Sequence, residues 1–322
     1  MSKVPEIFRS LADPTRLRIV ALLRAMELSV GELAQVLGQS QPRVSRHVKI
    51  LIDAGLAERR KEGSWVFLSL GRSERIAPLF ALLDQWTAVD GEDAWAIADA
   101  ARLAAVRADR AAAAERYFAL HAADWDELRS LHIAESEVEA AIGRALGAGS
   151  DGALVGRLVD IGTGTGRMIE LFGPAAASSL GIDKSPEMLR LARAKLGQAG
   201  LGNAELRQAD MYSLPLPAGS ADTVIIHQVL HYAQQPAAAV AEAARLLAPG
   251  GRLLIVDFAP HDREELRTRD AHARLGFTDE AVVGWMDQAG LAGRVVDHLE
   301  GGALTVTIWA GERPQARLKV VA

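Results

Sequence analysis

A glycine-rich segment between two apolar runs constrains the fold of this chain more than any other feature. Its sequence is Asp160-Ile-Gly-Thr-Gly-Thr-Gly166, and the apolar residues that lead into it have the composition of a buried parallel strand. A helical pattern begins at Arg167, so the first backbone N–H groups of that helix face the segment. Because glycine permits positive φ and close approach to the backbone, the segment predicts a strand–loop–helix unit with a ligand at its loop.

A second short apolar run ends at Asp183, about 20 residues beyond the loop, where an acid can accept both hydroxyls of a ribose. Strands and helices alternate after it, which indicates a doubly wound parallel α/β sheet with its ligand at the carboxyl ends of the strands. The glycine spacing is Gly-x-Gly-x-Gly and not the Gly-x-Gly-x-x-Gly of dinucleotide pyrophosphate sites. From the glycines alone, a nucleoside site and a plain turn in another α/β domain both remain open.

The glycine segment resembles the first motif of class I S-adenosylmethionine (SAM) dependent methyltransferases, and three later segments follow that family's pattern in order. These segments are Gln208–Met211, Ser220–Tyr232 and Leu246–Asp257. The resemblance spans about residues 115–312, and its branch is the one that contains small-molecule methylases of quinone biosynthesis. It implies a Rossmann-like sheet that ends in an antiparallel hairpin, formed by residues 295–298 and 304–309. It also implies SAM or S-adenosylhomocysteine (SAH) as the cofactor.

In that family the acid at the position of Asp183 binds the ribose. The acid at the position of Asp210 binds the adenine amino group, and the next apolar residue, Met211, packs on the ring. His227 lies in the position beside the methionine end of SAM, where a structural histidine is an equal alternative. The residues that the resemblance assigns to the cofactor are Asp160, Gly162, Thr163, Gly164, Gly166, Asp183, Lys184, Asp210, Met211 and His227.

The sequence assigns no catalytic residue. His227 and His231 have the spacing of a zinc-binding helix, but Gln228 stands where His-Glu-x-x-His needs its general base, so we expect no metal. Candidates on the acceptor side, after the fifth strand, are Asp257, His261 and His272. Methyl transfer to a soft or anionic acceptor needs alignment rather than a base, so the missing base argues neither for nor against activity.

The first 75 residues predict a helix-turn-helix. Helices are expected at 6–12, 14–25 and 30–37, with Asp13 and Ser29 as N-caps and Gly38 as the end of the third. A fourth helix follows the N-cap Ser40. Its apolar face carries Val44, Val48, Leu51 and Ala54.

The other side of the fourth helix is polar and basic, as suits a DNA major groove, where Gln and Arg read base edges and Lys and Ser hold phosphates. The runs 56–60 and 64–70 predict a β-hairpin, or wing, beside it. The predicted DNA contacts are Gln41, Arg43, Ser45, Arg46 and Lys49 on the helix, with Arg59, Arg60 and Lys61 on the wing. A winged helix that serves only protein contacts is the alternative.

This unit resembles the winged helix of the ArsR/SmtB family of bacterial regulators over nearly all of residues 5–70. The matching segments are Leu11–Val20, Gln39–Leu51 and Ala54–Gly63. The resemblance implies a homodimer on a double-stranded DNA operator, paired through its outer helices, here 6–12 and 74–86. Many relatives sense metals through cysteines or through histidines and acids. The chain has no cysteine and no histidine in residues 74–93, so we expect no metal site.

The charge of the chain is unevenly distributed. Residues 1–75 carry 13 Lys+Arg against 8 Asp+Glu, and the remainder carries 23 against 33. This favours contact between a polyanion and the front end alone. No apolar run approaches the ~18 residues of a membrane span, and the N-terminus has no apolar signal core. We therefore expect no membrane partner and a cytoplasmic protein.

The expected domains are a winged helix-turn-helix (1–73), a helical dimerisation and connector segment (74–114), a methyltransferase-like domain (115–312) and a tail (313–322). Residues 94–123 contain no glycine or proline and predict a long exposed helix. The aromatic residues near its end are Tyr117, Phe118 and Trp125. They either line the SAM pocket or anchor the helix to the core.

Two functions from different classes agree with these patterns. One is a transcription regulator whose methyltransferase-like domain senses SAM or SAH, and the other is an active small-molecule methyltransferase with a fused DNA-binding unit. The basic, groove-competent helix favours the regulator. A domain retained only for dimerisation is disfavoured, because every SAM-contacting motif keeps its residue type.

Overall fold

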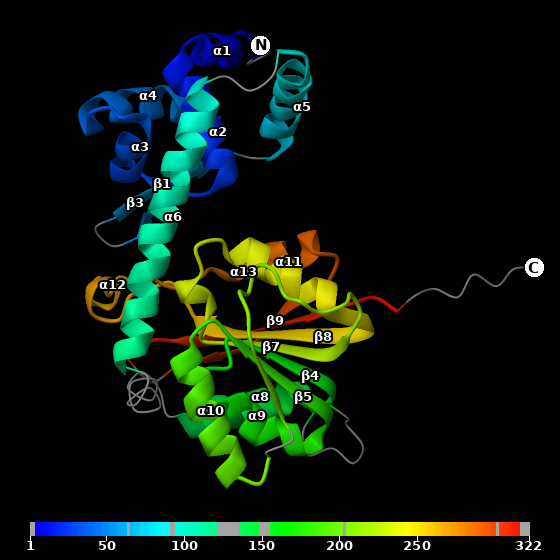
Figure 1. The fold of residues 1–322 in the computed structure, drawn as a ribbon. Coiled ribbons are helices and arrows are strands. Elements are labelled where there is room, and N and C mark those ends of the chain that lie inside the picture. Colours follow the sequence, from blue (N-terminus) through cyan, green and yellow to red (C-terminus); the bar gives the residue numbers. More distant parts are fainter. Residues whose placement is uncertain are drawn as a thin grey trace, which may run out of the picture. The chain divides into compact units, whose positions relative to one another are not determined.

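The computed structural model describes residues 4–62, 65–71, 73–90, 94–121, 135–147, 155–201, 204–300 and 303–315. The chain divides into two compact units, residues 1–112 and 113–322, and the boundary falls within one helix, α6 (Ala94–His121) (Figure 1). Among the described helices, none is both long and apolar enough to cross a membrane.

The first unit is a winged helix-turn-helix. Its elements are α1 (Val4–Leu11), α2 (Pro14–Ala25), β1 (Leu28–Ser29), α3 (Val30–Leu37), α4 (Gln41–Asp53), β2 (Ala57–Glu62), β3 (Trp65–Leu70), α5 (Ser73–Asp90) and the first part of α6. The predicted wing is confirmed as the antiparallel pair β2–β3. The two-residue strand β1, too short to predict, adds to β3 and completes a three-stranded sheet.

The predicted helix ends of this unit follow local chemistry. The Asp13 carboxylate accepts the N–H of Arg16 and caps α2. Ser29 and Glu32 form a reciprocal capping box at α3, which ends at Gly38 with φ +65°. Ser40 precedes α4 as predicted, but its side chain makes no capping hydrogen bond.

Two predictions about the connector need correction. The helix expected to end at Trp86, before a polar step over 87–93, continues to Asp90, because residues 87–90 contain no glycine or proline. The helix α6 was expected to be exposed, but one of its faces is buried. Asp99, Leu103 and Val106, spaced four and three residues apart, are each about 5% exposed, and the last two belong to the hydrophobic core of the first unit.

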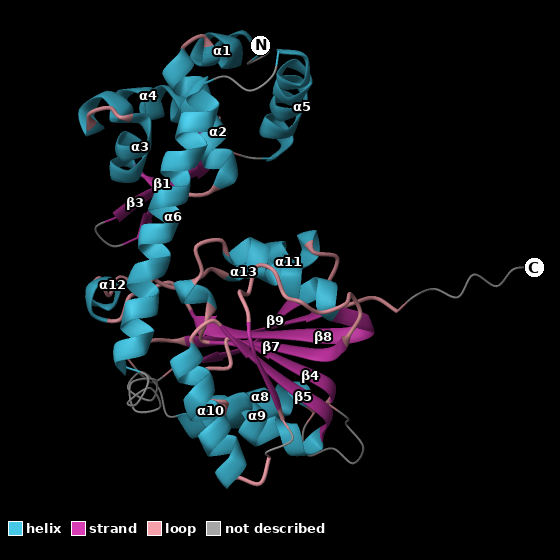
Figure 2. Ribbon diagram, viewed as in Figure 1, coloured by secondary structure: helices cyan, strands magenta, loops and turns pink. Residues whose placement is uncertain are grey.

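The second unit is a doubly wound sheet of seven strands (Figure 2). Its strands are β4 (Gly156–Ile161), β5 (Ala176–Asp183), β6 (Glu205–Gln208), β7 (Ala221–His227), β8 (Leu247–Phe258), β9 (Ala292–Leu299) and β10 (Val306–Glu312). Its helices are α8 (Glu135–Leu146), α9 (Arg167–Phe172), α10 (Pro186–Gln198), α11 (Pro236–Leu246), α12 (Glu265–Arg269) and α13 (Asp279–Gln288), with short 3-10 turns η2 (Gly173–Ala175) and η3 (Leu230–Tyr232).

The strand order is β6-β5-β4-β7-β8-β10-β9, and β10 runs antiparallel to both of its neighbours. The expected antiparallel terminal pair is confirmed, and its second strand lies inside the sheet, between β8 and β9. The order reverses between β4 and β7, so the carboxyl ends of these two strands flank the crevice in which such sheets bind ligands.

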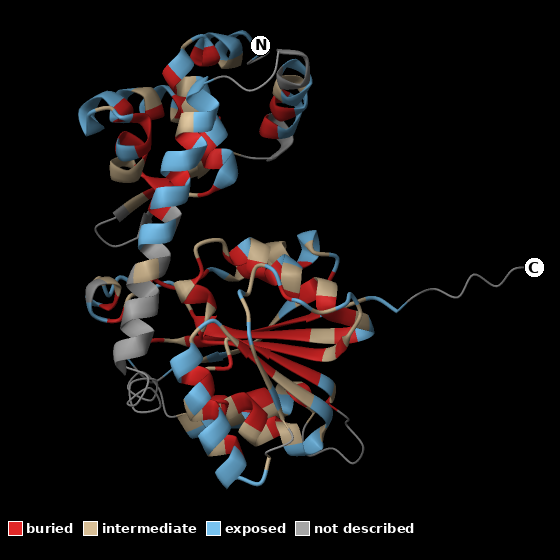
Figure 3. Ribbon diagram, viewed as in Figure 1, coloured by how far each residue is buried: buried red, intermediate tan, exposed pale blue. Residues whose placement is uncertain are grey.

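Alternation along the strands builds two cores, one on each face of the sheet, and buried residues fill the strand centres in Figure 3. On β7, Val224 and Ile226 pack with α11 and α13, while Ile225 packs with α8 and α9 on the opposite face. A strand buried on both faces has a nearly continuous apolar sequence, as in Val224-Ile-Ile226 of β7. With both faces covered by helices, the edge formed by the strand ends is the place left for a site.

One ion pair of this sheet gives a pH-dependent prediction. Arg157 on β4 holds Asp222 on β7 through two side-chain hydrogen bonds of 2.8 and 3.0 Å, which lower the pKa of the Asp222 carboxyl to about 2. Above the ordinary aspartate pKa the pair therefore stabilises the fold, and the effect disappears as the pH falls from about 4 towards 2. Both side chains are partly exposed, so the effect is at most about 1 kcal/mol.

We expect Asp222→Asn to lower the free energy of unfolding at pH 6, and we expect its difference from the wild type to shrink below pH 4 and to vanish near pH 2. Urea titrations across this range measure the difference. An equal gap at both pH values would contradict the assigned ionisation.

Candidate functional site

The glycine loop is folded against the end of β5. The N–H groups of Gly162 and Thr163 both donate to the Ile182 carbonyl, at 2.7 and 2.9 Å. Gly162 has φ +74°, and a Cβ atom there would lie 2.4 Å from a methyl group of Val229. Glycine is therefore required at this position by the segment that follows β7 as well as by its own backbone angle.

The other two glycines of the loop also have positive φ. Gly164 has φ +53° and Gly166 has φ +86°, and Gly166 is the residue from which α9 begins. A Cβ at Gly166 would be pressed against Leu196 and Ala192 of α10. The loop thus turns tightly from strand to helix, and the first N–H groups of α9 face it.

Asp183 and the glycine loop form one hydrogen-bonded unit. The Oδ2 atom of Asp183 accepts the N–H of Gly164 at 2.8 Å, and Oδ1 accepts the N–H of Ser185 at 2.8 Å. Burial among protein atoms raises the pKa of this carboxyl, although part of its surface is exposed, and the N–H groups of Ser185 and Gly164 partly oppose the shift. Each oxygen keeps acceptor capacity, so two neighbouring hydroxyl groups can bind side by side.

A buried hydroxyl lies within the same loop. Thr163 is 5% exposed, and its Oγ1 atom has no hydrogen-bond partner among the described residues. Buried polar atoms in proteins are normally paired, so this hydroxyl is an exception. Asp160 is buried near the end of β4, just before the loop. Lys184 is exposed, and its carbonyl accepts the Gln208 side chain at 3.0 Å.

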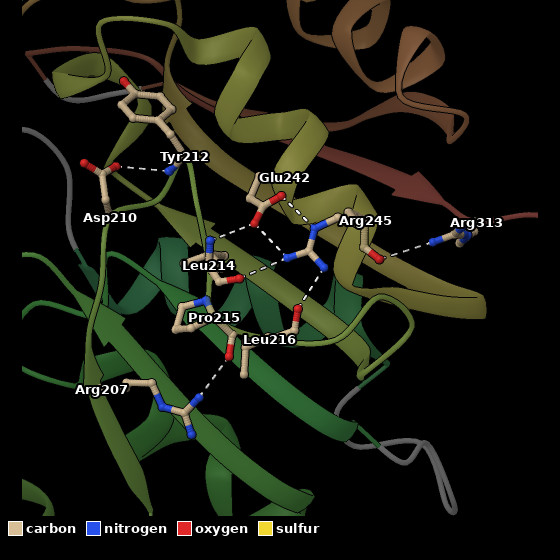
Figure 4. Close-up of polar contacts among 9 residues, drawn as sticks. All are labelled: Arg207, Asp210, Tyr212, Leu214, Pro215, Leu216, Glu242, Arg245 and Arg313. Atoms are coloured by element: carbon tan, nitrogen blue, oxygen red, sulfur yellow. Dashed lines mark hydrogen bonds and ion pairs between the residues drawn. The ribbon is translucent and has the colours of Figure 1, made fainter.

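The loop after β6 carries Asp210, which is exposed, and Met211, which is partly buried. A brace from α11 holds this loop, as Figure 4 shows. Glu242 accepts the N–H of Leu214 at 2.7 Å, and Arg245 donates to the carbonyls of Leu214 and Leu216 at 3.1 and 2.8 Å. Asp210 itself accepts the N–H of Tyr212 at 3.1 Å.

The brace ties the backbone of this loop to α11 through three hydrogen bonds. Sequence reasoning missed Glu242 and Arg245, because an acid and a base three residues apart on a helix usually form a surface pair. No signal in the sequence links them to a loop some 30 residues earlier.

At the end of β7, His227 is buried and Gln228 takes φ +53°, a conformation that non-glycine residues rarely adopt. The N–H of Gln228 donates to the Val256 carbonyl at 2.7 Å, which ties the strand end to β8. No group of three or more potential metal ligands occurs among the described residues.

The acceptor-side candidates come together at the ends of β7 and β8. Asp257 is fully buried, and its Oδ1 accepts His231 Nδ1–H at 2.8 Å while its Oδ2 accepts the backbone N–H of His231 at 3.2 Å. The His272 ring lies 4.2 Å from the His231 ring, and His261 packs against Phe258. The partnership of His231 with Asp257 was not predicted, although both lie just after strands that end on one edge.

In the first unit, α4 presents the predicted reading face. Val44, Val48 and Leu51 are buried. The exposed residues are Gln41, Arg43, Ser45, Arg46 and Lys49 on α4 and Arg59 on β2. The side chains of Arg60, Lys61, Tyr117 and Phe118, and all of Trp125, lie outside the described residues.

Comparison with known proteins agrees with this division. The profile described as "Bacterial regulatory protein, arsR family" matches residues 13–59. The arsenical resistance operon repressor of Escherichia coli is 41% identical over 91 residues, which are 28% of this chain and 70% of the repressor. The chain belongs to the ArsR family of bacterial regulatory proteins.

This ArsR-family chain also carries a methyltransferase domain, whose profile matches residues 159–255. An uncharacterised methyltransferase of Bacillus subtilis, YcgJ, is 35% identical over 107 residues, which are 33% of this chain and 42% of that protein. A chain of the solved complex between the Trm112 methyltransferase activator of Haloferax volcanii and its methyltransferase aligns with a TM-score of 0.50. That alignment is 18% identical and covers 63% of this chain and 99% of that one, so it supports the fold alone.

The glycine loop gives a stability prediction. Gly162→Ala is expected to destabilise the second unit. Backbone strain contributes roughly 1–3 kcal/mol, and the clash of the new methyl group with Val229 adds to this. Gly197→Ala is the matched control. Gly197 lies within α10 with open space around it, and alanine there stabilises a helix by about 0.4–1 kcal/mol. Urea unfolding measures both, and equal stabilities would contradict the described loop.

Proposed function

We propose that this chain is a DNA-binding transcriptional regulator whose methyltransferase domain binds SAM and SAH and thereby tunes DNA binding. The observation that carries the proposal is the coexistence, in one chain, of an exposed basic reading helix and a glycine loop joined to Asp183. A regulator that acts on DNA works in the cytoplasm of a bacterial cell, and this is the location we propose.

The residues of the second unit fit SAM and SAH. The free acceptor capacity of Asp183 suits the two ribose hydroxyls, and the unpaired Thr163 hydroxyl suits a polar group of the ligand. Asp210 and Met211, on the braced loop, would hold the adenine. The loop glycines, with Asp160, Lys184 and His227, would contact the amino-acid end. When bound, SAM supplies an electrophilic methyl group on a positively charged sulfur.

For the first unit we propose a homodimer on an inverted-repeat operator. ArsR-family membership supports DNA binding, and a two-fold dimer matches an inverted repeat. Gln41, Arg43, Ser45 and Arg46 would lie near bases, and Lys49, Arg59 and Arg60 near phosphates. Within the described part of the chain, Arg43, Arg46 and Lys49 form no ion pair that would compete with DNA.

The second candidate function is methyl transfer to a small molecule. The observation in its favour is the buried pair of His231 and Asp257 at the strand ends, because Asp257 holds one ring nitrogen of His231 and leaves the other for proton transfer. The methyltransferase relatives that the chain matches support the same candidate. A screen for SAH release with small-molecule acceptors separates the two functions.

The cofactor assignment predicts that Asp183→Ala weakens SAH binding by ~1.5–3 kcal/mol for each charged hydrogen bond removed. Isothermal titration calorimetry measures the affinity. Asp222→Asn serves as the control, because its carboxyl lies at the opposite end of the sheet and pairs with Arg157. An SAH affinity in Asp183→Ala equal to that of the control would exclude the ribose assignment.

The DNA assignment predicts that Arg43→Ala and Arg46→Ala weaken operator binding. Each lost phosphate contact, as in Lys49→Ala, reduces the slope of log affinity against log salt concentration by about one unit. Gel shifts at several salt concentrations measure both effects. The exposed Arg190 of α10 provides the control as Arg190→Ala. Unchanged operator binding in the Arg43 and Arg46 variants would mean that α4 is not the reader.

The regulatory claim is tested by DNA titration without ligand, with saturating SAM and with saturating SAH. Coupling between two sites typically changes affinity about 5- to 150-fold. SAM and SAH differ by one methyl group and one positive charge, so their effects can differ. Three superimposable curves would reject the sensor function and leave methyl transfer as the leading candidate.

A further inference from the structure

The first half of α6 is part of the DNA-binding unit. Leu103 and Val106 lie in the core of that unit. Asp99, four residues before Leu103 on the same helix, is 4% exposed. A carboxylate is rarely buried unless it is paired with a cation. Here the partner comes from α2, one of the helices of the winged helix.

Arg18 of α2 binds Asp99 through a two-pronged ion pair. Its Nε and Nη2 atoms donate to the two carboxylate oxygens at 2.6 and 2.7 Å. The same guanidinium lies 4.7 Å from the centre of the Trp95 ring, also on α6. Such planar pairs are the strongest and most specific ion pairs in proteins, and loss of one partner leaves a buried charge uncompensated.

The pair extends to the end of α3. Arg18 Nη2 lies 3.5 Å from the Leu37 carbonyl, and Arg102 of α6 donates to the Val36 carbonyl at 3.1 Å. These carbonyls belong to the last turn of α3, where helices leave acceptors unsatisfied and favour positive charge. Gly38 and the start of α4 follow directly. Two cations, both paired with Asp99, therefore contact the last carbonyls of α3, just before the reading helix α4 begins.

We propose that Asp99 and Arg102 are positioning residues for the reading helix, and that α6 transmits the effect of ligand binding to it. The helix α6 runs without interruption to His121, and the boundary between the two units lies inside it. The positioning role depends on the first unit alone. The transmission role rests on the proposed function.

The chain contains a matched control on the same helix. Arg24 of α2 binds Asp84 of α5 through two hydrogen bonds of 2.6 and 3.0 Å, and its guanidinium lies 4.3 Å from the Phe80 ring. This pair has the same chemistry, but it is about half exposed and joins α2 to α5 rather than to α6. Asp84→Asn therefore removes a comparable ion pair without touching the end of α3.

The experiment compares wild type, Asp99→Asn and Asp84→Asn by hydrogen exchange and by DNA titration. The probes are SAH and a duplex selected from random sequences by the wild-type protein. In Asp99→Asn we expect amides of residues 36–40 and 94–106 to exchange about tenfold faster, as for loss of one charged hydrogen bond. The SAH-induced change in DNA affinity is expected to fall below twofold. Asp84→Asn is expected to match wild type in both measurements.

The outcomes separate this inference from the proposed function. Unchanged exchange of residues 36–40 in Asp99→Asn overturns the positioning role, whatever the ligand does. If the wild type responds to SAH and Asp99→Asn responds equally, transmission through α6 is overturned. If the wild type selects no duplex or ignores SAH, the proposed function fails, and transmission fails with it, while exchange still decides the positioning role.

A second variant covers the case in which Asp99→Asn does not fold. Arg102→Met keeps the two-pronged pair of Arg18 with Asp99 and removes the bond to the Val36 carbonyl together with the longer 3.8 Å ion pair of Arg102 with Asp99, and the Arg102 side chain is about half exposed. The same two measurements on this folded variant are expected to shift in the same direction by a smaller factor. Exchange at residues 36–40 equal to that of wild type would overturn the assignment of Arg102.

Discussion

The end of β5 holds the glycine loop, and the organisation of the second unit depends on this contact. One carbonyl, that of Ile182, accepts two loop N–H groups, and the next side chain, that of Asp183, accepts a third. Val229, from the segment after β7, fills the space beside Gly162, so no side chain fits at that position. The ends of β4 and β5 and the segment after β7 are therefore held together, which brings Asp183, the glycine loop and the residues after β7 and β8 to one edge of the sheet.

The parts of the fold that follow local rules could be predicted from the sequence. The caps at Asp13 and Ser29 marked the starts of α2 and α3, Gly38 marked the end of α3, and the apolar residues before the glycine segment located the central strand β4. Position in a parallel sheet then placed Asp183 beside the glycine loop, because both follow strand ends on one edge. The residues assigned to SAM and DNA remain proposals, although the structure brings several of them together.

Contacts between distant segments could not be predicted, because their signals are not local. Glu242 and Arg245 look like an ordinary helical pair, yet they brace a loop near residue 214. Asp99 looks like a solvated residue of an alanine-rich helix, but it meets Arg18 across 81 positions of sequence. The polar step over residues 87–93 suggested a helix end at Trp86, but its first four residues contain no glycine or proline and the helix continues through them.

We propose that this chain couples the site at the glycine loop to the DNA-reading helix. Coupling between two binding sites is reciprocal, so DNA must change SAH affinity by the factor with which SAH changes DNA affinity. The most direct test is calorimetry of SAH binding to the full chain, alone and saturated with the selected duplex. We expect DNA to change the SAH affinity about 5-fold or more, by the same factor as that measured in the DNA titration. The same SAH affinity with and without DNA would contradict it.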